Sequence, residues 1–378
     1  MSPGTLSIRH HFADLSDPRR RHGQRHRLLD VIVIALCAVI AGSDTWQEVE
    51  TFAQRRRDWL ARFLDLDNGV PSHDTFERIF DRLDPLALQR CLLSWLRALA
   101  DGLKIGHIAI DGKTARRSGS PTRGIKALHL VSAWATEYSL TLGQVATQEK
   151  SNEITAIPEL LELLDLEGAL VTIDAMGCQK AIAAKIVEGG GDYVLTVKDN
   201  QEHLREDVID CLCAALDDEE AKSDTYEYED KGHGRIEKRW ITVITDPEGI
   251  RDQERWAKLK VVGSYYVERT VAGKTSCEMR FFIGSREMSA KRYGDVIRGH
   301  WGIENGLHWS LDVSFREDDS RIQKRNAGTN FALLRKIALS LLKRHPSKDS
   351  INRKRYAAAL DTSFLEEIIT SPDKLGDL

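Results

Sequence analysis

Two short apolar runs in this sequence each end in an aspartate, and each is followed at once by a turn signal. The first extends from Ile105 to Asp111 and continues into Gly-Lys; the second extends from Ala169 to Asp174 and continues into Ala-Met-Gly. An apolar run bounded by turn residues is typical of a buried strand. A carboxylate at the end of such a strand costs free energy unless a cation, backbone donors or a metal ion compensates its charge.

Two strands that end in aspartates can place both carboxylates beside one pair of metal ions, because parallel strands of an open sheet bring functional groups to the same edge. We therefore interpret Asp111 and Asp174 as metal ligands. The alternative for either residue alone is an ordinary N-cap of the helix that follows. Lys113, Arg116 and Arg117 come just after Asp111, where they could meet a polyanion such as a phosphate backbone.

The chain as a whole is not a polycation, since its 378 residues carry a formal charge of -4. Nucleic-acid binding would therefore depend on local basic patches. The six cysteines form no Cys-x-x-Cys pair, so we expect reduced thiols, no zinc site and a cytoplasmic location. The N-terminus has no apolar core ahead of its Arg/His cluster, and the apolar run 28–40 is too short to cross a bilayer. We therefore expect neither a secretory leader nor a membrane anchor.

Residues 1–100 have the pattern of an all-helical domain. A dense basic segment at 17–27 precedes an apolar helix at 28–41 and a further helix at 46–63. Asn68-Gly-Val-Pro-Ser72 then predicts a turn and an N-cap for a helix with a polar front. This arrangement resembles a helix-turn-helix whose second helix enters a major groove, and the basic segment favours DNA binding because phosphate contacts dominate affinity. A packed helical subdomain with a solvated charged face is the alternative.

The pattern changes after this helical region. Strands and helices follow in the order β-β-β-α-β-α-β, with Asp111 in the first strand and Asp174 in the fourth. A stretch of β-type runs then interrupts the chain before helices return. We expect four parts: a helical DNA-binding domain at 1–100, a core at 101–204 and 286–345, a β-rich insertion at 205–285 and a C-terminal tail at 346–378.

A third acidic candidate lies in the segment from Ala290 to Leu311, which we predict to be one helix. At helical spacing, Glu304 shares a face with His300, Trp301, Leu307 and His308. A glutamate on an aromatic and apolar face is unusual unless it is paired or bound to a metal. Pairing with one of the two histidines is the alternative, and Glu317 and Asp318 are rival third ligands.

Several motifs carry a resemblance to a known family. They are the helical segment at 8–95, Ile-Asp111-Gly-Lys-Thr, Thr-Ile-Asp174-Ala-Met-Gly, Val197-Lys-Asp-Asn-Gln201, Gly232-His-Gly-Arg235, Gly299-His-Trp-Gly-Ile-Glu304-Asn, Arg316-Glu-Asp and Asn330-Phe-Ala-Leu-Leu-Arg335. With these motifs the chain resembles the DDE transposases of bacterial insertion sequences over nearly its whole length. It is most similar to the branch that includes the H-repeat-associated proteins of Rhs elements.

The resemblance implies an α/β fold, namely a ribonuclease-H-like mixed sheet flanked by helices, with the N-terminal all-helical domain and the β-rich insertion. It implies that Asp111, Asp174 and Glu304 are catalytic and hold two Mg²⁺ (or Mn²⁺) ions. The implied reaction is strand cleavage and strand transfer on double-stranded DNA at element ends and target, carried out by a homo-oligomer at the bacterial nucleoid. A catalytically defective or domesticated DNA-binding protein, and a related nuclease without strand transfer, are the alternatives.

The chain departs from the family pattern in one place. Related transposases often carry Tyr, Arg and Lys at fixed positions around the third acid, where this chain has Ile297, His300 and Leu311. The cationic helper would then be His300 or Arg298. Lys198 and Arg235 are further candidates for DNA contact.

Overall fold

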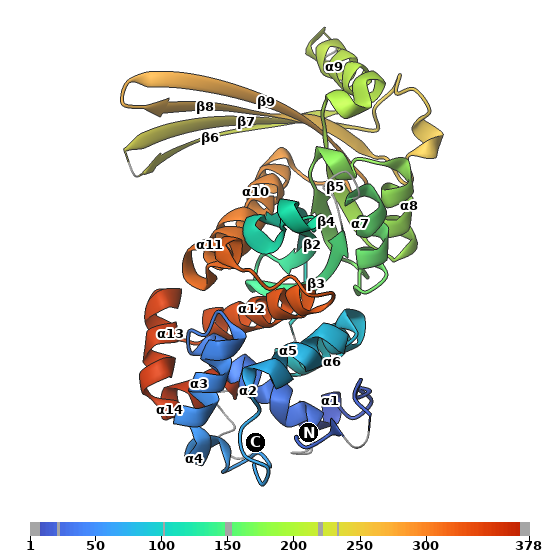
Figure 1. Ribbon diagram of the computed structural model, residues 1–378. Coiled ribbons are helices and arrows are strands. Elements are labelled where there is room, and N and C mark those ends of the chain that lie inside the picture. The colour runs from blue at the N-terminus through green and yellow to red at the C-terminus, as the bar shows by residue number, and fades with distance from the viewer. Residues whose placement is uncertain are drawn as a thin grey trace.

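The computed structural model describes residues 8–20, 23–100, 103–147, 153–217, 222–232 and 234–370. The strands are β1 (His107–Ala115), β2 (Leu128–Ala135), β3 (Leu140–Thr147), β4 (Leu170–Ile173), β5 (Asp192–Val197), β6 (Ser223–Gly232), β7 (Arg235–Thr245), β8 (Val261–Val271) and β9 (Lys274–Gly284). The α-helices are α1 (Ile8–His11), α2 (Leu28–Ile40), α3 (Trp46–Arg55), α4 (Arg57–Leu60), α5 (His73–Arg82), α6 (Pro85–Leu99), α7 (Glu153–Leu161), α8 (Lys180–Glu188), α9 (Glu202–Asp217), α10 (Ala290–His300), α11 (Trp309–Phe315), α12 (Ala327–Arg344), α13 (Ile351–Leu360) and α14 (Thr362–Ile369). Figure 1 shows the N- and C-terminal helices gathered below a sheet whose last strands project to one side.

The described strands form one continuous sheet in the order β3-β2-β1-β4-β5-β9-β8-β7-β6. β1 and β3 pair antiparallel with β2, whereas β4 pairs parallel with both β1 and β5. The first five strands therefore have the order and directions of a ribonuclease-H-like sheet. Helices α7 and α8 lie along one side of this part and α10 lies along the other (Figure 1). The predicted fold class is confirmed.

Strand β1 continues past the residue at which the sequence pattern placed its end. It pairs with β4 only from His107 to Ile110, but it pairs with β2 as far as Ala115. The turn predicted directly after Asp111 is therefore wrong, because Gly112 and Lys113 lie within the strand. Backbone pairing with β2, the next strand along the chain, overrides the local preference of a Gly-Lys pair for a turn.

Strands β6, β7, β8 and β9, which we call the β-arm, extend the same sheet away from the core (Figure 1). The link is β9, whose last residues Phe281–Gly284 pair with Val194–Val197 of β5. The β-rich insertion predicted at 205–285 thus contributes α9 and the β-arm, and it extends the core sheet instead of building a sheet of its own. The far ends of the hairpins are exposed, including most of the first half of β9, so the β-arm offers a surface beyond the core.

The N-terminal helices pack against the C-terminal ones. Helix α12 contacts α2, α5 and α6 as well as β2 and β3, and it lies between the sheet and the N-terminal helices in Figure 1. The rings of Trp46 in α3 and Phe331 in α12 meet edge to face with centroids 4.7 Å apart. Because α12 is covered from several directions, even its Arg335 and Lys336 are buried.

The segment expected to be a C-terminal tail forms α13 and α14, and both helices contact α2. Arg355 of α13 donates hydrogen bonds to the Val39 carbonyl and to the carboxylate of Asp44, so it is a structural residue. Residues 371–378 of the predicted tail lie outside the described part of the chain. Within the described ranges, no helix combines the length and the apolar character that a membrane crossing requires.

The helices of the predicted helix-turn-helix do contact each other, as α3 and α5. Helix α5 buries Phe76, Ile79 and Phe80, and its Glu77 accepts a salt bridge from Lys324 at 2.9 Å. The alternative, a helical subdomain with a solvated charged face, would show the same packing. The entry of α5 into a DNA groove stays a prediction.

Candidate active site

The three acidic residues singled out in the sequence meet at one cavity. Asp111 lies on β1, Asp174 directly follows β4, and Glu304 begins a π-helical turn, Glu304–His308, between α10 and α11. All three line a cavity of about 180 Å³, which Lys198, His300 and Trp301 also line. Segments separated by as many as 193 residues, from 111 to 304, thus converge here.

Strand register explains why the two aspartates are neighbours. Ile110 of β1 pairs with Ile173 of β4 in the parallel ladder. Asp111 and Asp174 each follow this pair by one residue, so they leave adjacent strands at the same level. Asp174 also accepts a hydrogen bond from the Met176 N–H at 3.0 Å and caps the short 3₁₀ turn Ala175–Gly177. Asp174 is therefore both an N-cap, as the alternative proposed, and a lining residue of the pocket.

Glu304 reaches the pocket from a helix that is not continuous. The single helix predicted from Ala290 to Leu311 is wrong, because α10 ends at His300 and the π-turn precedes α11. Glycines 299 and 302 weaken the helical preference at this break. In the π-turn Leu307 is buried, while Glu304 is exposed toward the pocket. Single π-turns inside helices occur frequently at functional sites.

The pKa of Asp111 is strongly shifted in the pocket. Burial raises the pKa of Asp111 from 3.8 to about 7, the Gly112 N–H opposes the rise by donating a hydrogen bond, and the charges of Asp174, Glu304 and Glu153 add to it. The side chain is only 16% exposed. Burial and the neighbouring acids therefore both disfavour the charged form of Asp111 in this pocket.

A fourth acid, Glu153 of α7, approaches the site, and no pattern in the sequence marks it. Its Oε1 lies 2.7 Å from Nε2 of His129, whose Nδ1 lies 2.7 Å from the Thr114 hydroxyl. A Cβ at Gly112 would come within 2.7 Å of both Glu153 Cδ and His129 Nε2. Position 112 therefore requires glycine, because the buried acid packs directly on the strand that carries Asp111. The sequence offers Ser151 or Asn152 as the N-cap of α7, and both lie outside the described residues.

Two histidines border the acids, and both are neutral at physiological pH. Burial lowers the pKa of His300 to about 4, although the charge of Asp174 partly opposes this effect. Nδ1 of His300 lies 3.0 Å from the Thr172 hydroxyl, which holds the ring in place. Burial likewise lowers the pKa of His308 to about 3, and its Nδ1 is 3.4 Å from Asp111. Neither imidazole can supply the positive charge that related transposases carry near the third acid.

Lys113 lies elsewhere than expected. Its side chain is 12% exposed, and its ammonium contacts Asp312 at 2.7 Å, Glu317 at 3.2 Å and Asp318 at 3.4 Å. These contacts occupy the ammonium in an ion-pair cluster between β1 and the segment after α11. The same cluster holds Glu317 and Asp318, the rival third ligands, and neither lines the cavity of the three acids.

The remaining basic candidates are on the surface. Arg116 and Arg117 keep 83% and 64% of their side chains exposed while pairing with Asp318 and Asp319. Lys198 is exposed at the pocket itself. Arg235 and Arg298 line a second hollow, under the β-arm, where Arg298 contacts Asp230 at 2.8 Å. Arg298 is thus turned away from the acids, and contact of these residues with DNA stays a prediction.

The donor set suits a hard divalent cation, because carboxylate oxygens are the ligands that Mg²⁺ prefers. Burial, and after it the charges of the neighbouring acids, raises the pKa of Asp111, and a cation beside it would oppose that rise. Among the described residues, however, no group of three or more His, Cys, Asp or Glu side chains is gathered closely enough to hold an ion. The chemistry of the site therefore fits a metal ion, whereas ligation by all three acids requires the exposed Glu304 to approach the aspartates.

Comparison with known proteins places the chain in a family. Residues 102–341 match the family described as "Transposase DDE domain", and residues 9–96 match the one described as "DDE_Tnp_1-associated". The chain is 40% identical to "Putative transposase YncI" of Escherichia coli O157:H7 over 98% of this chain and 96% of that protein. It is 37% identical to "H repeat-associated putative transposase YhhI" of Escherichia coli K12 over 95% of this chain and 96% of that protein.

A solved structure, the "piggyBac transposase synaptic complex with hairpin DNA", aligns with 99% of this chain and 79% of its own, at a TM-score of 0.42 and 11% identity. The family matches span both the helical region and the part of the chain that contains the three acids, as the sequence motifs predicted. The chain belongs to the family of transposases with a DDE domain, with H-repeat-associated proteins among its relatives.

Proposed function

We propose that this protein is a metal-dependent DNA transposase that cleaves DNA at the ends of an insertion sequence and joins those ends to target DNA. The observation that carries the proposal is the convergence of Asp111, Asp174 and Glu304 on one cavity from three distant segments. Membership of the DDE family supports the same conclusion. Double-stranded DNA as the substrate, a homo-oligomeric state on DNA and location at the bacterial nucleoid belong to this proposal.

The three carboxylates would hold two Mg²⁺ or Mn²⁺ ions. When bound, such ions activate an attacking water or 3′-hydroxyl and stabilise the departing oxygen of an in-line displacement. Asp111 would hold an ion as the carboxylate, so the proton that its raised pKa of about 7 retains at lower pH would first have to leave. Lys198 and Arg280, which line the same cavity, would position phosphate oxygens. His300, fixed by Thr172, would offer a neutral ring as a hydrogen-bonding group.

The test compares Asp111→Asn, Asp174→Asn and Glu304→Gln with the wild type in a Mg²⁺-dependent cleavage assay on DNA that carries the ends of the element. Each variant should lose most of the cleavage activity and keep a cooperative unfolding transition. Glu162→Gln is the matched control, since Glu162 is 62% exposed and pairs with Lys185 away from the pocket. Full activity in any one of the three pocket variants would contradict the proposal for that residue.

A joining assay with pre-cut ends separates the proposed activity from its alternatives. A transposase joins these ends to target DNA, whereas a nuclease of the same fold yields cut ends and no joined product. A defective or domesticated protein binds DNA and does neither. Absence of joining by the wild-type protein under conditions in which it cleaves would therefore reject strand transfer while keeping the nuclease.

A further inference from the structure

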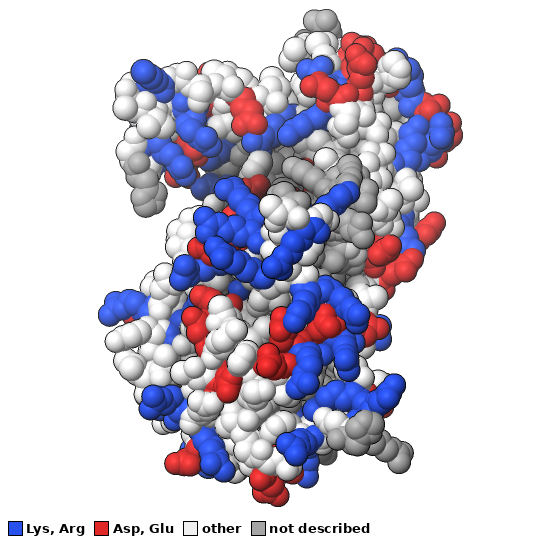
Figure 2. Space-filling view, viewed as in Figure 1, with Lys and Arg blue, Asp and Glu red and all other residues white. Residues whose placement is uncertain are grey.

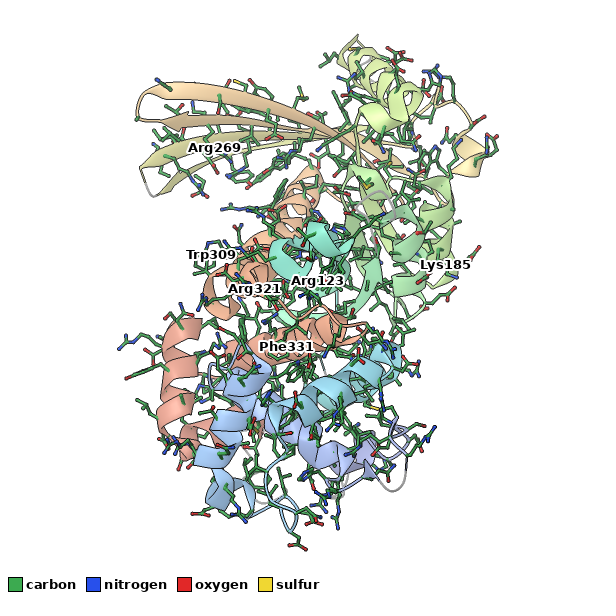
Figure 3. All side chains as sticks on the ribbon, in the orientation of Figure 1. Arg123, Lys185, Arg269, Trp309, Arg321 and Phe331 are labelled. Carbon is green, nitrogen blue, oxygen red and sulfur yellow. The ribbon has the colours of Figure 1, made fainter. Side chains whose placement is uncertain are left out.

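A hollow of about 790 Å³ lies under the β-arm, and we call it the arm groove. Its lining includes five arginines, namely Arg235, Arg239, Arg269, Arg280 and Arg298. The first three come from β7 and β8, Arg280 from β9 and Arg298 from α10. Figure 2 shows basic side chains around the hollow beneath the projecting strands, and Figure 3 places Arg269 on the β-arm.

The arm groove is lined by fewer carboxylates than guanidinium groups. One acid, Glu237, serves three arginines: it lies 2.6 Å from Arg269 and 3.5 Å from Arg235, and it contacts Arg239 directly. Five arginines against the two lining acids, Glu237 and Glu278, leave three positive charges in excess. Counting Asp230, which pairs with Arg298 without lining the groove, still leaves two.

Arg239 is the most informative member of this set. Its side chain is 8% exposed, and its Nη1 has no hydrogen-bond partner among the described residues. Asp230 is 3.9 Å from this nitrogen, which is too far for a hydrogen bond. A buried guanidinium N–H without an acceptor costs free energy. An anionic oxygen that enters the groove would remove that cost, so the geometry points to an anionic ligand.

The arm groove is continuous with the candidate active site. Tyr265, Arg280 and Trp301 line both hollows. The Arg280 guanidinium lies over the Trp301 ring, 4.2 Å from its centroid, and Trp301 is 37% exposed. A chain of anionic groups that leaves the pocket of the three acids would therefore pass Arg280 and reach the unpaired nitrogen of Arg239.

We propose that the arm groove binds the phosphate backbone of the DNA strand that flanks the reacting phosphate. This inference rests on the proposed function for the identity of its ligand. The guanidinium groups of Arg269 and Arg239 contact successive phosphates, because arginine forms paired hydrogen bonds to phosphate oxygens. The β-arm is then a DNA-binding element outside the N-terminal helical domain.

Two native thiols allow a test on the unmodified protein. Cys277 lines the arm groove and is exposed, whereas Cys213 is exposed on α9 and does not line it. The rate of alkylation by N-ethylmaleimide is measured at both thiols by peptide mass spectrometry, with and without a saturating short DNA duplex and without divalent cations. DNA should slow alkylation of Cys277 severalfold and leave Cys213 unchanged. An unchanged rate at Cys277, or equal slowing at both thiols, would overturn the inference.

Two substitutions, one that removes a positive charge from the arm groove and one that removes a negative charge, give an independent test by DNA-binding affinity. Arg269 is 52% exposed and can be replaced without disturbing the core. Arg269→Gln should weaken duplex binding and reduce the slope of log K against log salt by about 0.9, the value for one phosphate contact. Glu237→Gln should tighten binding, because it releases three arginines from their shared partner. Lys185→Gln, on α8 far from the β-arm in Figure 3, is the control and should change nothing.

If Arg269→Gln bound the duplex with the affinity and the salt dependence of the wild type, the inference would be overturned. This outcome does not depend on whether Glu237→Gln folds. These measurements need no catalysis, so their failure is distinguishable from failure of the proposed function. A protein that cuts DNA with Mg²⁺ but leaves Cys277 unprotected loses only the arm groove as a DNA site. A protein that protects Cys277 but never cleaves keeps the arm groove and loses the transposase activity. A protein that binds no DNA loses both.

Discussion

Replacing Asp111 by asparagine should stabilise the metal-free protein at neutral pH. The folded state raises the pKa of this carboxyl from 3.8 to about 7, chiefly through burial and then through the neighbouring acids. The folded protein therefore favours the protonated form, and this contribution to stability is complete below pH 3.8 and is lost as the pH rises toward 7. At about 1.36 kcal/mol per pH unit, the rise from 3.8 to about 7 corresponds to an upper bound of about 4 kcal/mol.

The free energy of unfolding of wild type and Asp111→Asn, measured by chemical denaturation in EDTA, tests this reasoning. The two proteins should be equally stable near pH 4, and the variant should gain up to about 4 kcal/mol as the pH approaches 7. Mg²⁺ should then stabilise the wild type more than the variant, because asparagine carries no charge for the ion to neutralise. Equal stability of the two proteins at pH 7 without metal, or a less stable variant, would refute the account of the pocket.

Three further predictions concern packing and ion pairs, all read out as changes in the free energy of unfolding. Gly112→Ala should destabilise the protein by about 1–3 kcal/mol, because the new Cβ overlaps buried Glu153; wild-type stability would contradict this packing. Lys113→Met should destabilise the protein by about 3–5 kcal/mol, because it leaves the buried Glu317 unpaired. The salt dependence of DNA binding should not change. A weaker salt dependence at wild-type stability would instead support the original prediction that Lys113 contacts DNA. Trp46→Ala should cost about 3–5 kcal/mol, since its ring packs on Phe331 between the N- and C-terminal helices, and a cost below about 1 kcal/mol would show that these helices do not depend on it.

Local sequence patterns singled out the three acids that line the cavity, because strand ends and helix faces leave local signals. Asp111 and Asp174 follow apolar runs, and the runs do form neighbouring parallel strands. Glu304 stands out by its aromatic and apolar neighbours. The assembly of these strands into a ribonuclease-H-like order came from the family resemblance, since periodicity alone does not determine which strands pair.

The other features of the site could not be predicted from the sequence, because they depend on contacts between distant segments. Lys113 follows Asp111 closely and looked like a basic surface residue, yet the acids that bury its ammonium lie about 200 residues further along the chain. The π-turn at Glu304 escaped detection, because a pattern with a period of 3.6 residues does not register one extra residue per turn. Apart from Arg235, which lies in one of the family motifs, the arginines of the β-arm showed no pattern of their own. Only the pairing of β9 with β5 brings them beside the pocket.

Anomalous scattering from crystals soaked in Mn²⁺ would show whether the three acids from distant segments share divalent ions. We expect Mn²⁺ between Asp111 and Asp174, with Glu304 drawn in from its exposed position in the π-turn to complete the ligands. Mn²⁺ bound instead by Glu317 and Asp318 with Lys113 displaced, or no Mn²⁺ near the two aspartates at saturating concentration, would contradict it.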